Sequence, residues 1–139
     1  MTTYVVDASV AIKWFVPEVL TDEALGFLQD EHTLFAPDLL WPEVGNIVWK
    51  KVRRGELEPE DARVIMALCH QVPFQVVESQ GLIDSALEIA LEYDRSVYDA
   101  MYLALAVHQN CPVLTGDLRL ANALASTDLR RHIAYVGAV

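Results

Sequence analysis

The chain has 139 residues, 53% of them hydrophobic, which predicts one folded domain over residues 1–139 and argues against a disordered binding segment. Its formal net charge of −10 excludes indiscriminate attraction to nucleic acids through net positive charge. No secretory signal or apolar run of membrane length (~20 residues) is visible, and Cys69 and Cys111 fit buried thiols, so we expect a cytoplasmic protein without membrane contact.

Short apolar runs alternate with amphipathic segments along the chain. In the first half we expect, in order, a strand over 4–6, a short helix to Trp14, a helix over 21–29, a strand over 33–36 and helices over 38–54 and 59–69. In the second half we expect a strand over 74–77, helices over 81–93 and 97–109, a strand over 112–114, a helix from Leu118 and a strand over 134–136. The helix over 97–109 is apolar on nearly every side, which places it centrally. This alternation predicts a three-layer α/β/α sandwich around a mostly parallel sheet of about four to five strands.

Four acidic residues stand at the junctions of these elements. Asp7 and Asp117 each follow a strand and precede a helix, whereas Glu43 and Asp99 lie in the first turns of two helices. Ligands of parallel sheets gather beyond the carboxyl ends of the strands, so these side chains can face one crevice. Taken singly, each acid also fits a helix cap that complements the helix dipole, and this alternative stays open.

A cluster of four carboxylates predicts a bound cation. Crowded carboxylates repel one another and raise one another's pKa unless a cation compensates. Hard divalent ions that prefer oxygen ligands supply this compensation, and Mg²⁺, or Mn²⁺ as a substitute, fits a site without His or Cys. Such a site suits phosphodiester hydrolysis by metal-activated water.

Four short segments contain these acids, and they occur along the chain in the order VVDAS, WPEVGN, SVYDAMYLALA and VLTGD. Together they resemble the signature blocks of PIN-domain ribonucleases, particularly the VapC-like toxins of type II toxin–antitoxin pairs. Each block is short, but their order and the α/β alternation match over nearly the whole chain. The resemblance implies a PIN-like fold and a Mg²⁺-dependent endoribonuclease that hydrolyses RNA, is inhibited by a cognate antitoxin protein and forms a homodimer.

The same resemblance assigns roles to individual residues. It matches the family's catalytic and metal-binding acids to Asp7, Glu43, Asp99 and Asp117. It matches supporting polar positions to Ser9, Asn46 and Thr115, for which local capping is the alternative. We expect Asp7 and Asp99 to be the principal metal ligands, with Glu43 and Asp117 binding the ion directly, through water, or positioning the attacking water. Whether one or two ions bind stays open.

The acidic balance leaves room for a basic track beside the cluster. Without the four acids the formal charge changes from −10 to −6. Lys50, Arg53 and Arg54 lie at the end of the helix that carries Glu43 and can share a stripe with it. Arg95 lies four residues before the third acid. These four cations are candidate RNA contacts, and the alternative is that they complement a helix C-terminus and face solvent.

An apolar groove for the antitoxin is a further expectation. Trp14, Phe15 and Val16, followed by the acidic Glu18, can form part of such a groove. Aromatic residues of this kind also fit the core, and the sequence does not decide between the two interpretations.

Two other functions remain open from the sequence. One is a different acidic-site α/β phosphohydrolase, but Asp7-Ala8-Ser9 lacks the second acid of an aspartate phosphatase, and no Gly-rich phosphate loop appears. The other is a non-catalytic PIN-like module that binds RNA or protein and uses its acids as helix caps. Metal-dependent cleavage of RNA distinguishes these functions.

Overall fold

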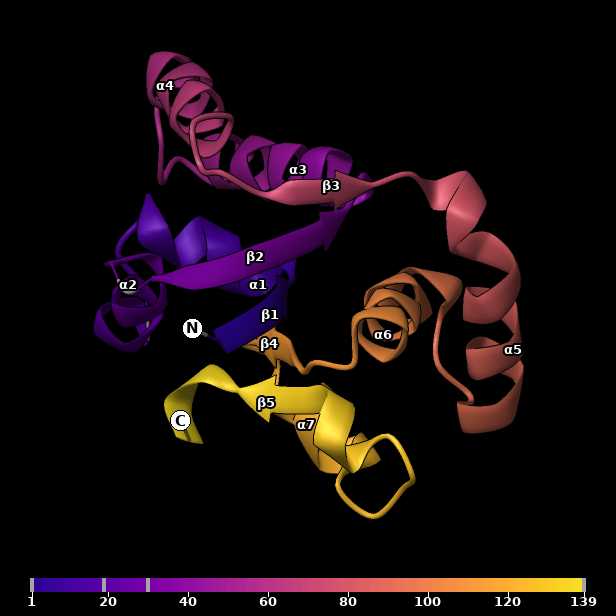
Figure 1. Ribbon diagram of the computed structural model, residues 1–139. Coiled ribbons are helices and arrows are strands. Elements are labelled where there is room, and N and C mark those ends of the chain that lie inside the picture. The colour runs from indigo at the N-terminus through magenta and orange to yellow at the C-terminus, as the bar shows by residue number, and fades with distance from the viewer. Residues whose placement is uncertain (1, 19, 30, 139) are drawn as a thin grey trace.

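Five parallel strands form the central sheet of the computed structural model, in the order β3-β2-β1-β4-β5 (Figure 1). The structure describes residues 2–18, 20–29 and 31–138. Within them the strands are β1 (Thr2–Val6), β2 (His32–Pro37), β3 (Gln75–Val77), β4 (Val113–Thr115) and β5 (Ile133–Tyr135). The prediction of a mostly parallel sheet of four to five strands is confirmed, and each of these pairings is parallel.

Helices connect the strands. The α-helices are α1 (Ala8–Ala11), α2 (Thr21–Gln29), α3 (Leu40–Arg53), α4 (Pro59–Cys69), α5 (Ile83–Tyr93), α6 (Val97–Gln109) and α7 (Leu118–Leu124). Short 3₁₀ turns are η1 (Ile12–Trp14), η2 (Ser79–Gly81), η3 (Arg130–His132) and η4 (Val136–Ala138). Because η2 precedes α5, the helix predicted over 81–93 begins at Ile83.

Alternate residues of the central strands face two different helix layers. Val5 and Val113 pack with α6, whereas their chain neighbours Val6 and Leu114 pack with α1 and α3. Figure 1 shows α5 and α6 on one side of the sheet and α1, α2 and α3 on the other. The predicted three-layer α/β/α sandwich is confirmed.

Helix α6 lies at the centre of one layer. All of its residues over 100–106 are buried, which confirms the central position predicted from its apolar composition. Ser96 starts the helix because its hydroxyl accepts a hydrogen bond from the backbone N–H of Asp99 at 3.1 Å. Even so, none of the helices in the described ranges is both long enough and apolar enough to cross a membrane.

Most element bounds differ from the predictions by one or two residues, and two of these differences have clear local reasons. α3 begins at Leu40 and not at Asp38, because the Asp38 carboxylate accepts hydrogen bonds from the backbone N–H of Ser79, at 3.1 Å, and from its hydroxyl. β4 begins at Val113 and not at Pro112, since proline has no N–H to donate to a neighbouring strand. Neither shift moves an acid away from its junction.

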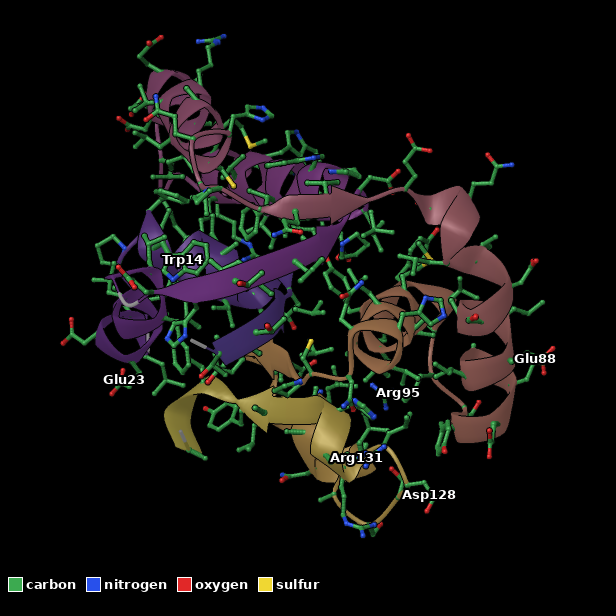
Figure 2. All side chains as sticks on the ribbon, viewed as in Figure 1. Trp14, Glu23, Glu88, Arg95, Asp128 and Arg131 are labelled. Atoms are coloured by element: carbon green, nitrogen blue, oxygen red, sulfur yellow. The ribbon has the colours of Figure 1, made fainter. Side chains whose placement is uncertain are left out.

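Trp14 belongs to the core, which is one of the two interpretations that the sequence left open, and it does not line a surface groove. Its side chain is 7% exposed, and its ring stacks on Phe74 with centroids 5.9 Å apart. The indole N–H donates to the carbonyl of Ala24 in α2 at 2.8 Å, and Figure 2 shows Trp14 between α2 and the sheet. The acidic Glu18 is also engaged, because its carboxylate lies 2.9 Å from the Lys51 ammonium. A buried ring with a satisfied N–H has no surface to offer a partner.

Candidate active site

The carboxyl edge of the sheet collects the four predicted acids. Asp7 follows β1 and Asp117 follows β4, and these two strands are parallel neighbours. α3 comes directly after β2, so Glu43 in its first turn lies at the same edge. α6 leads back to the start of β4 and therefore begins at the carboxyl edge, with Asp99 in its first turn.

All four acids line one pocket of about 480 Å³. Ser9, Asn46 and Lys50 contribute further polar side chains to its lining, and Tyr98 and Tyr102 contribute aromatic rings. A volume of this size lies within the usual range of small-ligand sites. Acids that are far apart in the sequence thus share one concave surface.

Hydroxyl groups hold the carboxylate of Asp7. The Ser9 hydroxyl donates to its Oδ1 at 2.5 Å and accepts the backbone N–H of Gly116 at 2.8 Å. The fully buried Thr115 hydroxyl also bonds this carboxylate, and it accepts the backbone N–H of Asp117 at 3.0 Å. Since both hydroxyls accept an N–H from the β4–α7 junction, their own protons point to Asp7.

Burial dominates the electrostatics of Asp7. It raises the pKa of this carboxyl from 3.8 to about 6, against the opposing effect of hydrogen bonds from Ser9, Thr115 and the Val10 backbone. The negative charge of Glu43 raises the pKa further. Ionising Asp7 therefore costs more free energy in the folded chain than in water, and a cation beside the carboxylate would lower that cost.

Glu43 is held from the opposite layer. The Tyr102 hydroxyl on α6 donates to Glu43 Oε1 at 2.6 Å, across 59 residues of sequence. Burial raises the pKa of Glu43, this hydrogen bond lowers it, and the charge of Asp99 raises it. The charge of Glu43 thus raises the pKa of Asp7, and the charge of Asp99 raises the pKa of Glu43, which makes Glu43 the electrostatic link between the other two acids.

The remaining two acids have cationic or backbone partners. Asp99 forms an ion pair with Arg95 at 3.1 Å, in which the side chains are 36% and 26% exposed. Asp117 is exposed and caps α7, accepting the backbone N–H groups of Arg119 and Leu120 at 3.0 and 3.3 Å. The capping role that the sequence left open is therefore present at Asp117 together with its place in the pocket.

The donor set of the pocket suits a hard divalent cation. Its lining offers carboxylate, hydroxyl and amide oxygens without His or Cys, and a cation would relieve the repulsion between Asp7 and Glu43. As placed, no three His, Cys, Asp or Glu side chains among the described residues come close enough together to hold an ion. One or two of the carboxylates are enough for Mg²⁺, because this ion usually keeps several water molecules as its other ligands.

The four predicted RNA-contacting cations differ in their position relative to the pocket. Lys50 is exposed and lines the pocket, on the same stripe of α3 as Glu43 and the predicted supporting residue Asn46. Arg53 instead lies over the Trp49 ring, 5.4 Å from its centroid, and does not line the pocket, so the predicted stripe does not extend to it.

Arg54 and Arg95 complete the set. Arg54 is exposed where α3 ends and lies outside the pocket lining, like Arg53. Arg95 lies beside α6 in Figure 2 and contacts the pocket through its ion pair with Asp99. Lys50 is thus the predicted cation that faces the pocket directly.

Sequence reasoning missed two residues that contact the predicted acids or their supports. Tyr102 stands three residues after Asp99, the spacing that brings side chains to one helix face, and this spacing was a usable signal. Gly116 leaves room for the Lys13 side chain, because a Cβ there would come within 2.8 Å of Lys13 Cε and 3.2 Å of Ser9 Oγ. No local sequence pattern predicts that contact, since Lys13 lies in η1, far from Gly116 along the sequence.

The family model of the PIN domain matches residues 4–124 of the chain. Ribonuclease VapC3 of Pyrobaculum aerophilum is 33% identical over 119 residues, which cover 84% of this chain and 91% of that protein. Among solved structures, PAE2754 of Pyrobaculum aerophilum superposes with a TM-score of 0.71 at 26% identity, covering 98% of this chain and 85% of that one. A toxin–antitoxin complex from Klebsiella pneumoniae contains a similar fold, with a TM-score of 0.63, 18% identity and coverage of 96% and 97%.

Proposed function

The chain belongs to the PIN-domain family, among the VapC ribonucleases, and from this premise we propose that it hydrolyses RNA phosphodiester bonds. The reaction takes place in the pocket at the carboxyl edge of the sheet, within one PIN-like domain that spans residues 1–139. One observation supports this assignment above the others. Acids from four different elements, Asp7, Glu43, Asp99 and Asp117, line a single pocket, whereas helix caps alone need no convergence.

Asp7 and Asp99 would hold a divalent metal ion, Mg²⁺ or Mn²⁺, with Glu43 and Asp117 as further ligands or as acceptors for the attacking water. When bound, the ion supplies charge neutralisation and an activated water for attack on phosphorus. Ser9 and Thr115 keep the Asp7 carboxylate oriented through their hydroxyl protons.

Lys50 would bind the substrate, and so would Asn46, which the resemblance matched to a supporting position beside the acids. Both are exposed on α3 at the side of the pocket, so Lys50 can neutralise a phosphate that approaches the acids and Asn46 can hydrogen-bond a sugar or phosphate oxygen. Arg95 becomes available to a phosphate once Asp99 exchanges it for the metal ion. These contacts are few, which fits an acidic protein that does not bind nucleic acid indiscriminately.

The chain acts as the toxin of a toxin–antitoxin pair in the cytoplasm. Its VapC relative and the similar fold in a toxin–antitoxin complex support a cognate antitoxin as the protein partner. A homodimer is the proposed assembly. Cys69 and Cys111 are both buried free thiols, as a reducing compartment allows.

Cleavage by the purified chain, freed of any antitoxin, tests the proposal. We expect RNA cleavage in Mg²⁺ or Mn²⁺ and none in chelator, and Asp7→Asn lowers the rate at least about a hundredfold, because several kcal/mol of transition-state stabilisation depend on the ion. Asp84→Asn is the matched control, an exposed acid in the first turn of α5 outside the pocket. A chain that neither binds metal nor cleaves RNA is a non-catalytic module, and full activity of Asp7→Asn would place the site elsewhere.

A further inference from the structure

Tyr102 stands where three elements of the pocket meet. Its hydroxyl donates to Glu43 Oε1 on α3 at 2.6 Å and accepts the backbone N–H of Ala8, the first residue of α1. The side chain is 5% exposed, and the ring is held in the layer formed by α6. One phenol group thus links the helix that carries Asp99 to the elements that carry Asp7 and Glu43.

We propose that Tyr102 is a positioning residue that holds the Glu43 carboxylate for metal binding. The N–H of Ala8 occupies the phenol oxygen as donor, so the phenol proton is directed to Glu43. With Oε1 fixed in this way, Oε2 remains the oxygen that can turn to the ion. Ala8 directly follows Asp7, so the same contact sets the spacing between the Asp7 and Glu43 carboxylates. The inference deepens the proposed function and rests on its metal site.

Tyr102→Phe tests this inference because it removes one oxygen and keeps the buried ring. Thermal unfolding of the full chain is followed while Mn²⁺ or Mg²⁺ is titrated, and RNA cleavage is measured in parallel. We expect the metal concentration at half-maximal stabilisation to rise on the order of tenfold, the usual effect of removing a partner of a ligand. Tyr4→Phe is the matched control, since Tyr4 packs against Phe27 and His32 away from the pocket.

A double-mutant cycle with Glu43→Gln separates positioning from a structural role. If Tyr102 acts through Glu43, adding Tyr102→Phe to Glu43→Gln leaves the metal titration unchanged. Independent, additive shifts would overturn the inference, as would a Tyr102→Phe titration equal to that of the unmodified chain. Absence of any metal response in the unmodified chain would overturn the proposed function and this inference with it.

A second, independent observation concerns Tyr98 at the rim of the same pocket. Its side chain is 64% exposed although it is aromatic, and it lines the pocket one residue before Asp99. Lys50 and Asn46 line the same pocket from α3. With a formal charge of −10 and few cations at the site, phosphate contacts alone give weak attraction to RNA. Affinity must therefore come in part from contacts that do not depend on charge.

We propose that the Tyr98 ring stacks on an unpaired base of the RNA next to the scissile phosphate. Exposed aromatic rings bind single-stranded RNA in this way, because an unpaired base offers its face. A strand that lies across the pocket can place its phosphate near the acids and Lys50 while the adjoining base rests on Tyr98. The ring then selects unpaired over double-stranded RNA, since paired bases do not offer a free face. This inference also rests on the proposed function.

Binding of a short labelled single-stranded RNA, measured by fluorescence anisotropy in an Asp7→Asn background over a salt series, tests the stacking. Tyr98→Leu weakens binding on the order of tenfold with an unchanged salt slope, whereas Tyr98→Phe binds as before. Lys50→Gln, in contrast, makes the salt slope shallower. Equal RNA binding by Tyr98→Leu would overturn the inference, and a loss of self-association in that variant would assign the ring to a protein contact.

Discussion

The pocket has two sides that differ in burial and in the partners of their acids. The inner pair, Asp7 and Glu43, is held by hydroxyl groups of neighbouring side chains, and burial raises both pKa values. The outer pair, Asp99 and Asp117, is satisfied by the Arg95 guanidinium and by backbone N–H groups of α7. The outer pair is thus stable without an ion, whereas the inner pair is ionised at a cost.

This difference determines how much free energy a metal ion gains at each pair of acids. A cation gains most from the inner pair, because it relieves both desolvation and mutual repulsion there. At the outer pair it must first replace partners that are already present. We therefore expect the inner acids to contribute more to metal binding and catalysis than Asp117, whereas Asp99, a principal ligand, must first exchange Arg95 for the ion.

The largest expected difference in RNA cleavage is between a variant of an inner acid and a variant of an outer acid. Glu43→Gln is expected to lower single-turnover RNA cleavage at least about a hundredfold, since it removes a half-buried charge on which several kcal/mol of metal-assisted stabilisation depend. Asp117→Asn is expected to lower it only about tenfold, because asparagine still caps α7. Glu88→Gln on the outer side of α5 is the matched control (Figure 2). Equal losses in the two site variants would contradict the division into inner and outer acids.

Gly116→Ala is expected to disturb the inner pair indirectly, through the Ser9 hydroxyl that holds Asp7. The new Cβ would lie 2.8 Å from Lys13 Cε and 3.2 Å from Ser9 Oγ, so it displaces the hydroxyl that holds Asp7. We expect cleavage to fall about ten- to a hundredfold and the unfolding free energy to fall by roughly 1–3 kcal/mol, as for an overpacked site.

Gly26→Ala provides the matched control in α2. Apart from its chain neighbours and the backbone of its own helix, no atom lies within 4 Å of the added Cβ. Alanine favours a helix over glycine by roughly 1 kcal/mol, so this variant is expected to gain stability and keep its activity. Cleavage by Gly116→Ala at the rate of the unmodified chain would show that the Ser9 contact does not position Asp7.

The inner pair also predicts how stability varies with pH. The pKa of Asp7 is raised from 3.8 to about 6, so between these values the folded, metal-free chain keeps a proton that the unfolded chain has lost. The free energy of unfolding therefore decreases as pH rises through this interval and stays lower above it. Denaturant unfolding in chelator measures the slope, which is expected to be shallower in Asp7→Asn.

Metal binding is expected to follow the opposite trend. Because the ion must displace the Asp7 proton, apparent Mg²⁺ affinity increases by up to about tenfold per pH unit toward pH 6 and then levels off. Calorimetric titration at several pH values measures this rise. A Mg²⁺ affinity that is constant from about pH 4 to pH 6 would contradict a role for Asp7 as a ligand.

Arg95→Gln is expected to have the smallest effect, at the outer pair. The pair with Asp99 is partly exposed, so its loss changes the free energy of unfolding by less than about 1 kcal/mol. Mg²⁺ affinity is expected to increase roughly two- to fivefold, because the Arg95 guanidinium no longer competes with the ion for Asp99, and a partly exposed ion pair contributes less than about 1 kcal/mol. Arg63→Gln, which breaks the exposed pair with Glu60, is the control. Weaker Mg²⁺ binding by Arg95→Gln would show that Arg95 supports Asp99 instead of competing for it.

Much of the fold could be predicted because its signals are local. The apolar run before Asp7, the capping Ser96 and the fully apolar segment over 100–106 each predict an element from neighbouring residues alone. The residues missed or misplaced depend on contacts between elements. Trp14 has the same aromatic character whether it lies in a groove or in the core, and only its packing on Phe74 decides the matter. Arg53 is an exception, because it lies over the ring of Trp49, four residues earlier on the same helix, and that spacing is visible in the sequence.

The sequence by itself determined where the four acids stand, at strand ends and in first helical turns, because the period of the apolar residues locates these junctions. It thereby predicted that the acids can meet at one edge, since parallel strands share a carboxyl edge, but it left open that each acid is only a helix cap. Only the tertiary structure decided which acids are buried, and which side chains hold them. The hydrogen bond between Tyr102 and Glu43 spans 59 residues, and the cost of burying a charge depends on every element packed around it. A local sequence pattern therefore cannot reveal the cost of burying each carboxylate.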